Sequence, residues 1–171
     1  SDTISISSLL NNVQCSDSLN GSIAVVAIGG TGSLIASWTS SIPTFTDPGV
    51  FNLNGLDSGS YTIGISDSNN CTFDTTFNLI KPSEILATAQ VIPVDCFGNA
   101  NGEVSLNLSG GTGSFNTNWS GPNGFSSVDN NLIGIDTGSY SLNIIDSLGC
   151  TKDTLIVISQ PDEISLSAVI T

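Results

Sequence analysis

Hydrophobic and polar residues alternate with a period of two along several stretches of this chain. The segments 61–65 (YTIGI), 104–108 (VSLNL) and 140–144 (YSLNI) each place an apolar side chain at every second position. This period is typical of a β-strand with one buried face, and no window of the chain has the 3.6-residue period of a helix. Gly, Asn, Asp and Ser interrupt the pattern at strand-length intervals. The pattern therefore predicts an all-β chain.

The strand pattern belongs to a repeat. A shift of 81 residues places GGTGS at 29–33 on GGTGS at 110–114, and a shift of 79 places 52–72 on 131–151. Two copies of about 80 residues, with roughly six to eight short strands each, predict tandem immunoglobulin-like antiparallel β-sandwich domains. The predicted domains are 1–83, 84–163 and, as the first strand of a following repeat, 164–171. We expect the chain to be part of a longer tandem array.

The four cysteines occupy matching places in the two copies. Cys15 and Cys96 precede a predicted strand, and Cys71 and Cys150 follow one after a turn. Pairing Cys15 with Cys71 and Cys96 with Cys150 respects the repeat symmetry within each domain. Each such bond would contribute roughly 4 kcal/mol in the chain-entropy model and would imply an oxidising, extracytoplasmic compartment. The alternative is two buried free thiols in each domain.

Charge and composition exclude several classes of function. Two basic residues against fifteen acidic ones give a formal net charge of −13, which repels nucleic acid and anionic membrane surfaces. The chain has no His and no Met, so the commonest general base is absent. The longest purely apolar run, 23–28, is too short to insert in a bilayer. We therefore expect neither an enzyme nor catalytic residues, and no membrane insertion.

The repeated GGTGS pentapeptide has two interpretations. A phosphate-binding loop would need a following helix or a P-loop Lys, and neither is present. The favoured interpretation is a turn between two strands, in which glycines adopt positive φ. The glycines concerned are Gly29, Gly30, Gly32, Gly110, Gly111 and Gly113.

Four aromatic side chains also have alternative roles. Trp38 and Trp119 share a strand face with apolar or small residues, which favours a core position over an exposed sugar-stacking platform. Tyr61 and Tyr140 follow Gly-Ser at strand starts, and we expect them to be core or corner residues.

A calcium site is the one cofactor alternative. The segments 17–21 and 99–103 and the turns at Asp67 and Asp146 supply oxygen ligands, but no EF-hand register or dense Asp cluster is present. Asp and Asn in such places usually serve the turn itself. We therefore expect no metal and no cofactor.

The combined motif C…G…NGxV/I…GGTGS…W…L/I-D-S/T-G-S-Y…D-S-x-x-C-T…P-x-E-I resembles the SprB-type repeat of Bacteroidota, found in giant cell-surface gliding adhesins. Both copies carry it over nearly the whole chain. The matching residues are Cys15, Gly21, Gly29–Gly32, Trp38, Gly59, Tyr61, Asp67, Cys71, Cys96, Gly102, Gly110–Gly113, Trp119, Gly138, Tyr140, Asp146 and Cys150.

The resemblance implies a protein that the type IX secretion system exports and that is displayed as a filament on the outer membrane. In gliding members of the family, a motor carries the adhesin along the cell surface. The family motif marks no catalytic residue. Secreted proteins of this phylum also carry O-glycans at Asp-Ser/Thr motifs, which makes the following residues candidates: Thr3, Ser18, Thr75, Ser147 and Thr154.

The leading hypothesis is a non-catalytic, structural and adhesive repeat segment of a giant secreted adhesin, forming an elongated stalk for surface attachment and gliding motility. Its partners would be neighbouring repeats, surface polysaccharide or the substratum, and the outer-membrane gliding and secretion machinery. One alternative is a carbohydrate- or surface-binding module, which would expose an aromatic. Another is a set of accessory repeats in a large secreted hydrolase.

Overall fold

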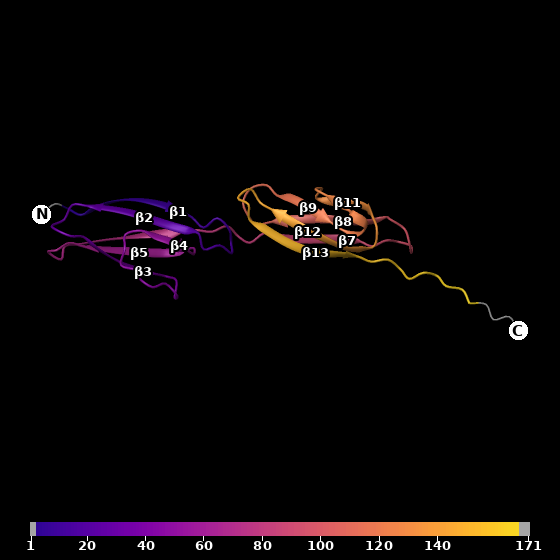
Figure 1. Cartoon of the computed structure of the whole chain (residues 1–171), viewed down its shortest axis with the longest axis horizontal. Coiled ribbons are helices and arrows are strands. Elements are labelled where there is room, and N and C mark those ends of the chain that lie inside the picture. Colours follow the sequence, from indigo (N-terminus) through magenta and orange to yellow (C-terminus); the bar gives the residue numbers. More distant parts are fainter. Residues whose placement is uncertain (1–2, 168–171) are drawn as a thin grey trace. The chain divides into compact units, whose positions relative to one another are not determined.

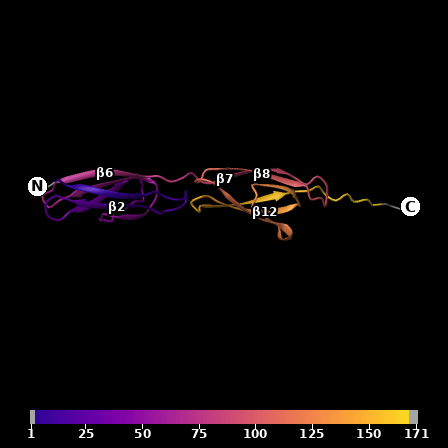
Figure 2. The same cartoon turned by 90° about the horizontal axis from the view of Figure 1, so that it is seen from above.

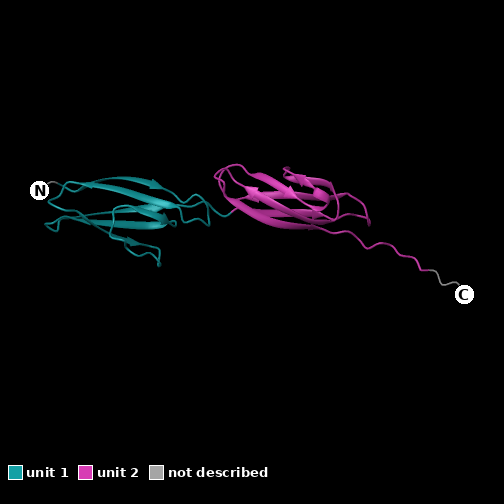
Figure 3. Cartoon of the chain, in the orientation of Figure 1, with its two compact units in different colours: residues 1–84 teal, residues 85–171 magenta. Residues whose placement is uncertain are grey.

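The computed structural model describes residues 3–167. Within that range the chain forms thirteen β-strands and one short 3₁₀ turn, Pro122–Gly124. It separates into two compact units, Ser1–Glu84 and Ile85–Thr171, which Figure 3 colours teal and magenta.

The first unit contains six strands in two antiparallel sheets (Figure 1). One sheet has the order β1-β2-β4 and the other has the order β3-β5-β6. The strand bounds are β1 Ser5–Asn11, β2 Gly21–Ile28, β3 Ile35–Ser40, β4 Leu53–Leu56, β5 Gly59–Ser66 and β6 Thr72–Leu79.

The second unit repeats this arrangement with one added edge strand. Its sheets have the orders β7-β8-β11 and β10-β9-β12-β13. The bounds are β7 Leu86–Ile92, β8 Gly102–Ser109, β9 Asn116–Ser120, β10 Ser126–Ser127, β11 Asn131–Ile135, β12 Gly138–Ile145 and β13 Thr151–Ile158. Figure 2 gives a second view of the same strands.

Both units have the strand connectivity of an immunoglobulin sandwich. With the strands of the first unit named A, B, C, E, F and G in chain order, one sheet is A-B-E and the other is C-F-G. All the pairings are antiparallel. The predicted fold class, all-β with tandem immunoglobulin-like antiparallel β-sandwiches, is confirmed.

The alternating sequence pattern builds the core of each unit. In β5, Tyr61, Ile63 and Ile65 are each at most 1% exposed, while the residues between them are only half-buried. In the first unit these side chains pack with residues of the facing sheet, such as Ile23 and Val25, in one hydrophobic cluster. A strand with one face on this cluster needs the period of two seen in the sequence.

The two tryptophans lie in the cores and are 3% exposed each. The indole nitrogen of Trp38 donates a hydrogen bond of 2.7 Å to the carbonyl oxygen of Val50, and that of Trp119 donates one of 2.8 Å to the carbonyl oxygen of Asp129. The polar atom of each buried ring is therefore satisfied by the backbone.

The two tyrosines close the corner between strands E and F. The hydroxyl group of Tyr61 donates to the carbonyl oxygen of Asp57 at 2.9 Å, and that of Tyr140 donates to the carbonyl oxygen of Asp136 at the same distance. A tyrosine at the start of strand F that bonds back to the preceding backbone is a hallmark of this fold. The rings also pack edge to face on Phe45 and Phe125.

The tail after β13 differs from the predicted strand at 164–171. Residues 164–167 are not in a strand, and 168–171 lie outside the described residues. Ile164 and Leu166 are 97% and 95% exposed, whereas Ile4 and Ile85, which precede the first strand of each unit, are buried. Within the described residues the tail has no second strand to pair with.

Replacing Trp119 with Ala should lower the free energy of unfolding of the second unit by about 3–5 kcal/mol, because it leaves a large cavity between the sheets. Chemical denaturation followed by circular dichroism measures the change. Ile133→Ala is the matched control, since Ile133 lies in the same unit and is 77% exposed; its effect should stay within about 0.5 kcal/mol. Equal effects of the two substitutions would contradict the core position of Trp119.

Candidate functional site

The polar sequence motifs gather at the two ends of each sandwich. We call the "turn end" the one formed by GGTGS and the turn before the last strand, which are 29–33 and 67–71 in the first unit and 110–114 and 146–150 in the second. We call the "loop end" the opposite one, formed by the connection between the first two strands, 12–20 or 93–101.

At the turn end, a buried aspartate organises the backbone. The carboxylate of Asp67 accepts hydrogen bonds of 2.9 Å from the amides of Thr31, Asn69 and Cys71. The hydroxyl oxygen of Ser68 accepts one of 3.1 Å from the amide of Ser33. The aspartate therefore ties the GGTGS turn to the turn before β6.

The second unit has the same arrangement. The carboxylate of Asp146 accepts from the amides of Thr112 at 2.8 Å and of Leu148 and Cys150 at 2.9 Å. The hydroxyl oxygen of Ser147 accepts from the amide of Ser114 at 2.9 Å. These matching contacts explain why Asp-Ser recurs at the same place in both copies.

The glycines of GGTGS have the backbone conformation that a tight turn requires. Gly29, Gly30 and Gly32 have φ of 87°, 69° and 74°, and the equivalent glycines of the second unit have φ of 76°, 56° and 76°. A Cβ on Gly32 or Gly113 would also collide with the serine hydroxyl that holds the turn. Only glycine meets both conditions without strain.

These contacts argue against an anion-binding role for GGTGS. The amides of Thr31 and Ser33 already donate to a side chain of the same unit, so they are not offered to a phosphate. The acceptor at the centre is itself a carboxylate, which would repel an anion. The pentapeptide is therefore a structural turn in both units.

Backbone amides lower the pKa of both buried aspartates. At Asp67, the hydrogen bond from the amide of Cys71 has the largest effect and lowers the pKa, and burial opposes it. At Asp146, burial has the largest single effect and raises the pKa, but the bonds from the amides of Cys150, Thr112 and Leu148 together outweigh it. The net result in both cases is a pKa below the ordinary value of 3.8.

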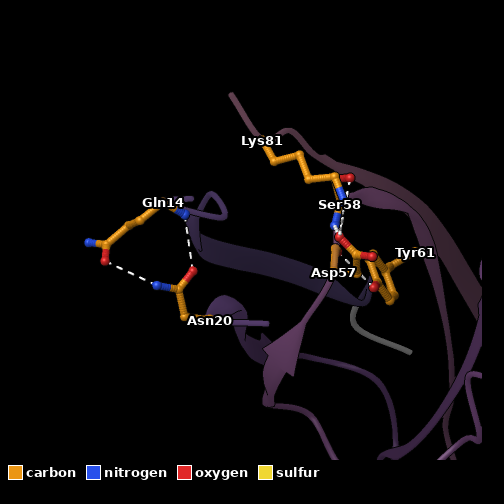
Figure 4. Close-up of polar contacts among 6 residues, drawn as sticks. All are labelled: Gln14, Asn20, Asp57, Ser58, Tyr61 and Lys81. Atoms are coloured by element: carbon orange, nitrogen blue, oxygen red, sulfur yellow. Dashed lines mark hydrogen bonds and ion pairs between the residues drawn. The ribbon is translucent and has the colours of Figure 1, made fainter. Parts of the chain in front are cut away.

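The loop end of the first unit is held by amide and ionic contacts (Figure 4). The side chain of Asn20 accepts from the amide of Gln14 and donates to the side-chain oxygen of Gln14, both at 3.0 Å, and so closes the loop that carries Cys15. The amide of Asp95 makes the equivalent bond to Asn101 in the second unit, at 3.2 Å.

An ion pair lies beside this loop. The ammonium group of Lys81 lies 2.9 Å from the carboxylate of Asp57, which also accepts from the amide of Ser58 (Figure 4). The bond from Lys81 is the largest influence on the Asp57 carboxyl and lowers its pKa. Because both side chains are about one third exposed, this pair contributes little to stability.

The predicted disulfides within each copy are wrong. Cys15 and Cys150 are disulfide-bonded, and Cys71 and Cys96 are exposed free thiols, so the pairs Cys15–Cys71 and Cys96–Cys150 are not present. The physical reason is their position in the fold. Cys15 and Cys96 lie at the loop end of their units, whereas Cys71 and Cys150 lie at the turn end.

The length of the sandwich keeps these cysteines apart. The strands between the two ends have eight residues, and they span roughly 23 Å at about 3.3 Å per residue. A disulfide needs Cα atoms within about 7 Å. The sequence could have shown this. Cys15 and Cys96 lie in the A–B connection and Cys71 and Cys150 lie in the F–G connection, and these two connections are at opposite ends of an immunoglobulin sandwich.

The five candidate O-glycosylation residues fall in different environments. Thr3 and Ser147 are exposed and Ser18 is half-buried. Thr75 and Thr154 are half-buried and pair with the core residues Ile63 and Leu142 on the neighbouring strand. The hydroxyl of Ser147 is already engaged with Ser114. Modification of these residues stays a prediction.

No surface groove of either unit can offer a histidine as a general base, because the chain has none. In the first unit, a groove of about 480 Å³ is lined by Phe45, Val50 and Tyr61, among others. In the second unit, a groove of about 330 Å³ runs between β7 and β13.

Within residues 3–167, no group of three or more Cys, Asp or Glu side chains is placed to hold a metal ion. Over the same range, no helix is long and apolar enough to cross a membrane.

The buried aspartates give a pH prediction. Because the folded-state pKa of each is below its unfolded value, their stabilising contribution is complete above the unfolded pKa, near pH 4, and is lost as the pH falls through the folded pKa. Asp146→Asn should lower the midpoint of thermal unfolding at pH 7 by several degrees and weaken its decline between about pH 4 and pH 2.

Thermal unfolding followed by circular dichroism from pH 7 to pH 2 measures this effect. Asp162→Asn is the matched control, because Asp162 is an exposed residue in the tail. The unfolding midpoints of this variant should match those of the unchanged chain at every pH. A profile for Asp146→Asn that is superimposable on the control at every pH would contradict the role of the buried carboxylate.

Among known protein families, one has a model that matches part of the second unit. Residues 88–124, which run from β7 to the 3₁₀ turn, match the model of a family described as the SprB repeat. A search of curated proteins gives no match. The matched segment contains the second GGTGS and Trp119, which are part of the motif that carries the resemblance.

Similar solved structures contain Ig domains. One holds the N-terminal eight Ig domains of Down Syndrome Cell Adhesion Molecule, with 12% identity and a TM-score of 0.49, over 94% of this chain and 25% of that chain. Another is the amphioxus IgVJ-C2 molecule, with 13% identity and a TM-score of 0.39, over 90% of this chain and 96% of that one. The chain thus spans about a quarter of the first of these proteins. The match to the family model confirms that this chain contains a SprB-type repeat, which lies in its second unit.

Proposed function

We propose that this chain is a non-catalytic, structural and adhesive repeat segment of a secreted cell-surface adhesin, and that its copies act in series as an elongated stalk. The observation that carries the proposal is the direction of the chain through each unit. A stalk requires every copy to receive the chain at one end and to release it at the other.

Each unit meets this requirement. In the first unit, β1 begins at Ser5 opposite Ile28 at the turn end, and β6 finishes at the loop end, where the amide of Val13 donates to the carbonyl oxygen of Ile80 at 3.1 Å. In the second unit, β7 begins opposite Ser109, and the amide of Val94 donates to the carbonyl oxygen of Ser159 at 2.9 Å. The first and last strands of a unit therefore run in the same direction.

The family match supports the adhesive part of the proposal. The segment matched to the SprB repeat, 88–124, has counterpart residues in the first unit, including GGTGS and the tryptophan that follows it. Residues 80–85 join β6 to β7 and contain Pro82, which limits the flexibility of the connection. Export by the type IX secretion system, attachment to the outer membrane and a part in gliding motility complete the proposed role.

The buried tryptophans disfavour the carbohydrate-binding alternative. Sugar stacking needs an aromatic face open to solvent, but Trp38 and Trp119 are 3% exposed and donate to backbone carbonyl groups. The proposed stalk therefore carries its partner contacts elsewhere, at a tip or spread weakly over many copies.

Small-angle scattering on chains of different repeat number tests the stalk. A four-copy chain, made by joining residues 1–163 to residues 4–171, keeps the natural spacing because Ile4 then follows Glu163 as Ile85 follows Glu84. Compared with the present chain, its maximum dimension should nearly double. Growth of only about 1.3-fold, the value for one compact globule of twice the length, would contradict the proposal.

A further inference from the structure

Four neighbouring apolar side chains lie on the outer face of the β1-β2-β4 sheet of the first unit. Ala24, Val26 and Ile28 alternate along β2 with residues that face the core, such as Val25. Val26 and Ile28 are 62% and 64% exposed. Leu9 lies opposite Ala24 on the neighbouring strand and is 65% exposed. We call these four residues the outer patch: Leu9, Ala24, Val26 and Ile28.

The equivalent sheet of the second unit shows that the fold does not require this patch. The shift of 81 residues that relates the two copies places four polar residues on the patch: Gln90, Ser105, Asn107 and Ser109. All four are exposed, and they lie on β7 and β8, which match β1 and β2. Polar residues are the usual occupants of the solvent-facing side of an antiparallel sheet. The outer patch is therefore a property of the first unit and not of the sandwich.

The face that carries the patch also has no charged side chain. The strands β1, β2 and β4 read SISSLLN, GSIAVVAI and LNGL, whereas the whole chain has a formal net charge of −13. In the second unit, the corresponding sheet has Glu103, which lies between Ile92 and Ile133 on the neighbouring strands. Of these two sheets, only that of the first unit therefore combines an apolar outer face with the absence of charge.

The charge distribution indicates what binds to this face. A cationic partner would be attracted to the acidic parts of the chain and would gain nothing from the patch. A second copy of this chain carries the same negative charge, so most approaches of two copies bring carboxylates together. The uncharged face avoids this repulsion, and a twofold axis places the patch of one copy on the patch of the other. Both copies then bury apolar side chains that are exposed in the single chain.

We propose that the first unit of this chain forms a reversible dimer with the first unit of a second copy, and that the outer patch of each is the contact. The inference requires only the fold of the first unit. It goes beyond the proposed function, because it assigns a partner and a surface to this unit. Its test is also independent of whether the copies act as a stalk.

The size of the face limits the strength of the dimer. β2 has eight residues and is about 26 Å long at about 3.3 Å per residue, and three strands spaced by about 4.8 Å cover about 14 Å. Each copy therefore offers roughly 350 Å², and the pair buries roughly 700 Å². Stable interfaces bury at least about 1,200 Å² in total. We therefore expect weak association that is visible only at high protein concentration.

Sedimentation equilibrium of the present chain, at concentrations up to about 1 mM, tests the proposal. A reductant is present so that the exposed free thiols of Cys71 and Cys96 do not link two chains. The apparent mass should rise with concentration toward that of a dimer. The association should strengthen at higher salt, which screens the repulsion between two acidic chains. A monomer at every concentration, or association that weakens as salt is added, would overturn the proposal.

Variants that borrow residues from the second unit locate the contact. Val26→Asn together with Ile28→Ser gives β2 the residues found at positions 107 and 109, which the second unit carries on the same face of its sheet. Circular dichroism should show an unchanged fold, and the dissociation constant should rise at least about tenfold. A double variant that associates as the unchanged chain does, as pairing through the backbone of the edge strand β1 would produce, contradicts the proposal.

Ile35→Asn is the matched control for the double variant. Ile35 is 65% exposed on the other sheet of the same unit, and the second unit has an asparagine at the equivalent position 116. This substitution should leave the dissociation constant unaltered. An effect as large as that of the double variant would show that the outer patch is not the contact.

A pair of charged variants tests whether the patch meets itself. Val26→Lys and Val26→Asp each place a charge in the middle of the patch, so each variant alone should be monomeric at concentrations where the unchanged chain associates. An equimolar mixture of the two should associate again, because opposite charges then face each other across the contact. A mixture that stays monomeric would rule out a contact between identical faces. Undiminished association of either variant alone would rule out the patch.

Discussion

The first and last strands of each sandwich run in the same direction, and much of the structure follows from this constraint. The chain begins each unit at the turn end and leaves it at the loop end. Each copy therefore has its N-terminus and its C-terminus at opposite ends of the sandwich. The constraint also fixes where the cysteines lie. Cys15 and Cys96 follow the first strand, at the loop end, and Cys71 and Cys150 precede the last strand, at the turn end. A disulfide between Cys15 and Cys71, or between Cys96 and Cys150, therefore cannot close within a folded copy.

The two ends of a unit are stabilised by different means. At the turn end of the second unit, the buried carboxylate of Asp146 accepts hydrogen bonds from three backbone amides, and the hydroxyl oxygen of Ser147 accepts one from a fourth. Hydrogen bonds within the unit therefore hold this end closed. At the loop end of the first unit, the connections are held by an exposed amide pair and by the Lys81–Asp57 ion pair. The buried aspartates are therefore structural charges, and the stability that they contribute is lost as the pH falls through their lowered folded-state pKa.

The sequence predicted the features that depend on local pattern. The period of two located the strands, because a strand on a sandwich core buries every second side chain, as Tyr61, Ile63 and Ile65 do. The repeat located the equivalent residues, including the buried tryptophans and the glycines of GGTGS. The disulfides were assigned wrongly, because repeat symmetry says which cysteines are equivalent and not at which end of the sandwich each one lies. The contacts of Asp67 and Asp146 were also not predicted in detail, since they join turns more than thirty residues apart in the sequence.

The chain consists of two sandwiches, each with its own core, through which the polypeptide passes in series. Single-molecule force spectroscopy between the two termini, with a reductant present to keep all cysteines as thiols, is the sharpest test of this organisation. We expect two separate unfolding events, each releasing about 25 nm of chain, as follows for about 80 residues at about 3.6 Å per residue less the folded length. A single event releasing twice that length, with both halves unfolding together, would rule out two independent cores in series.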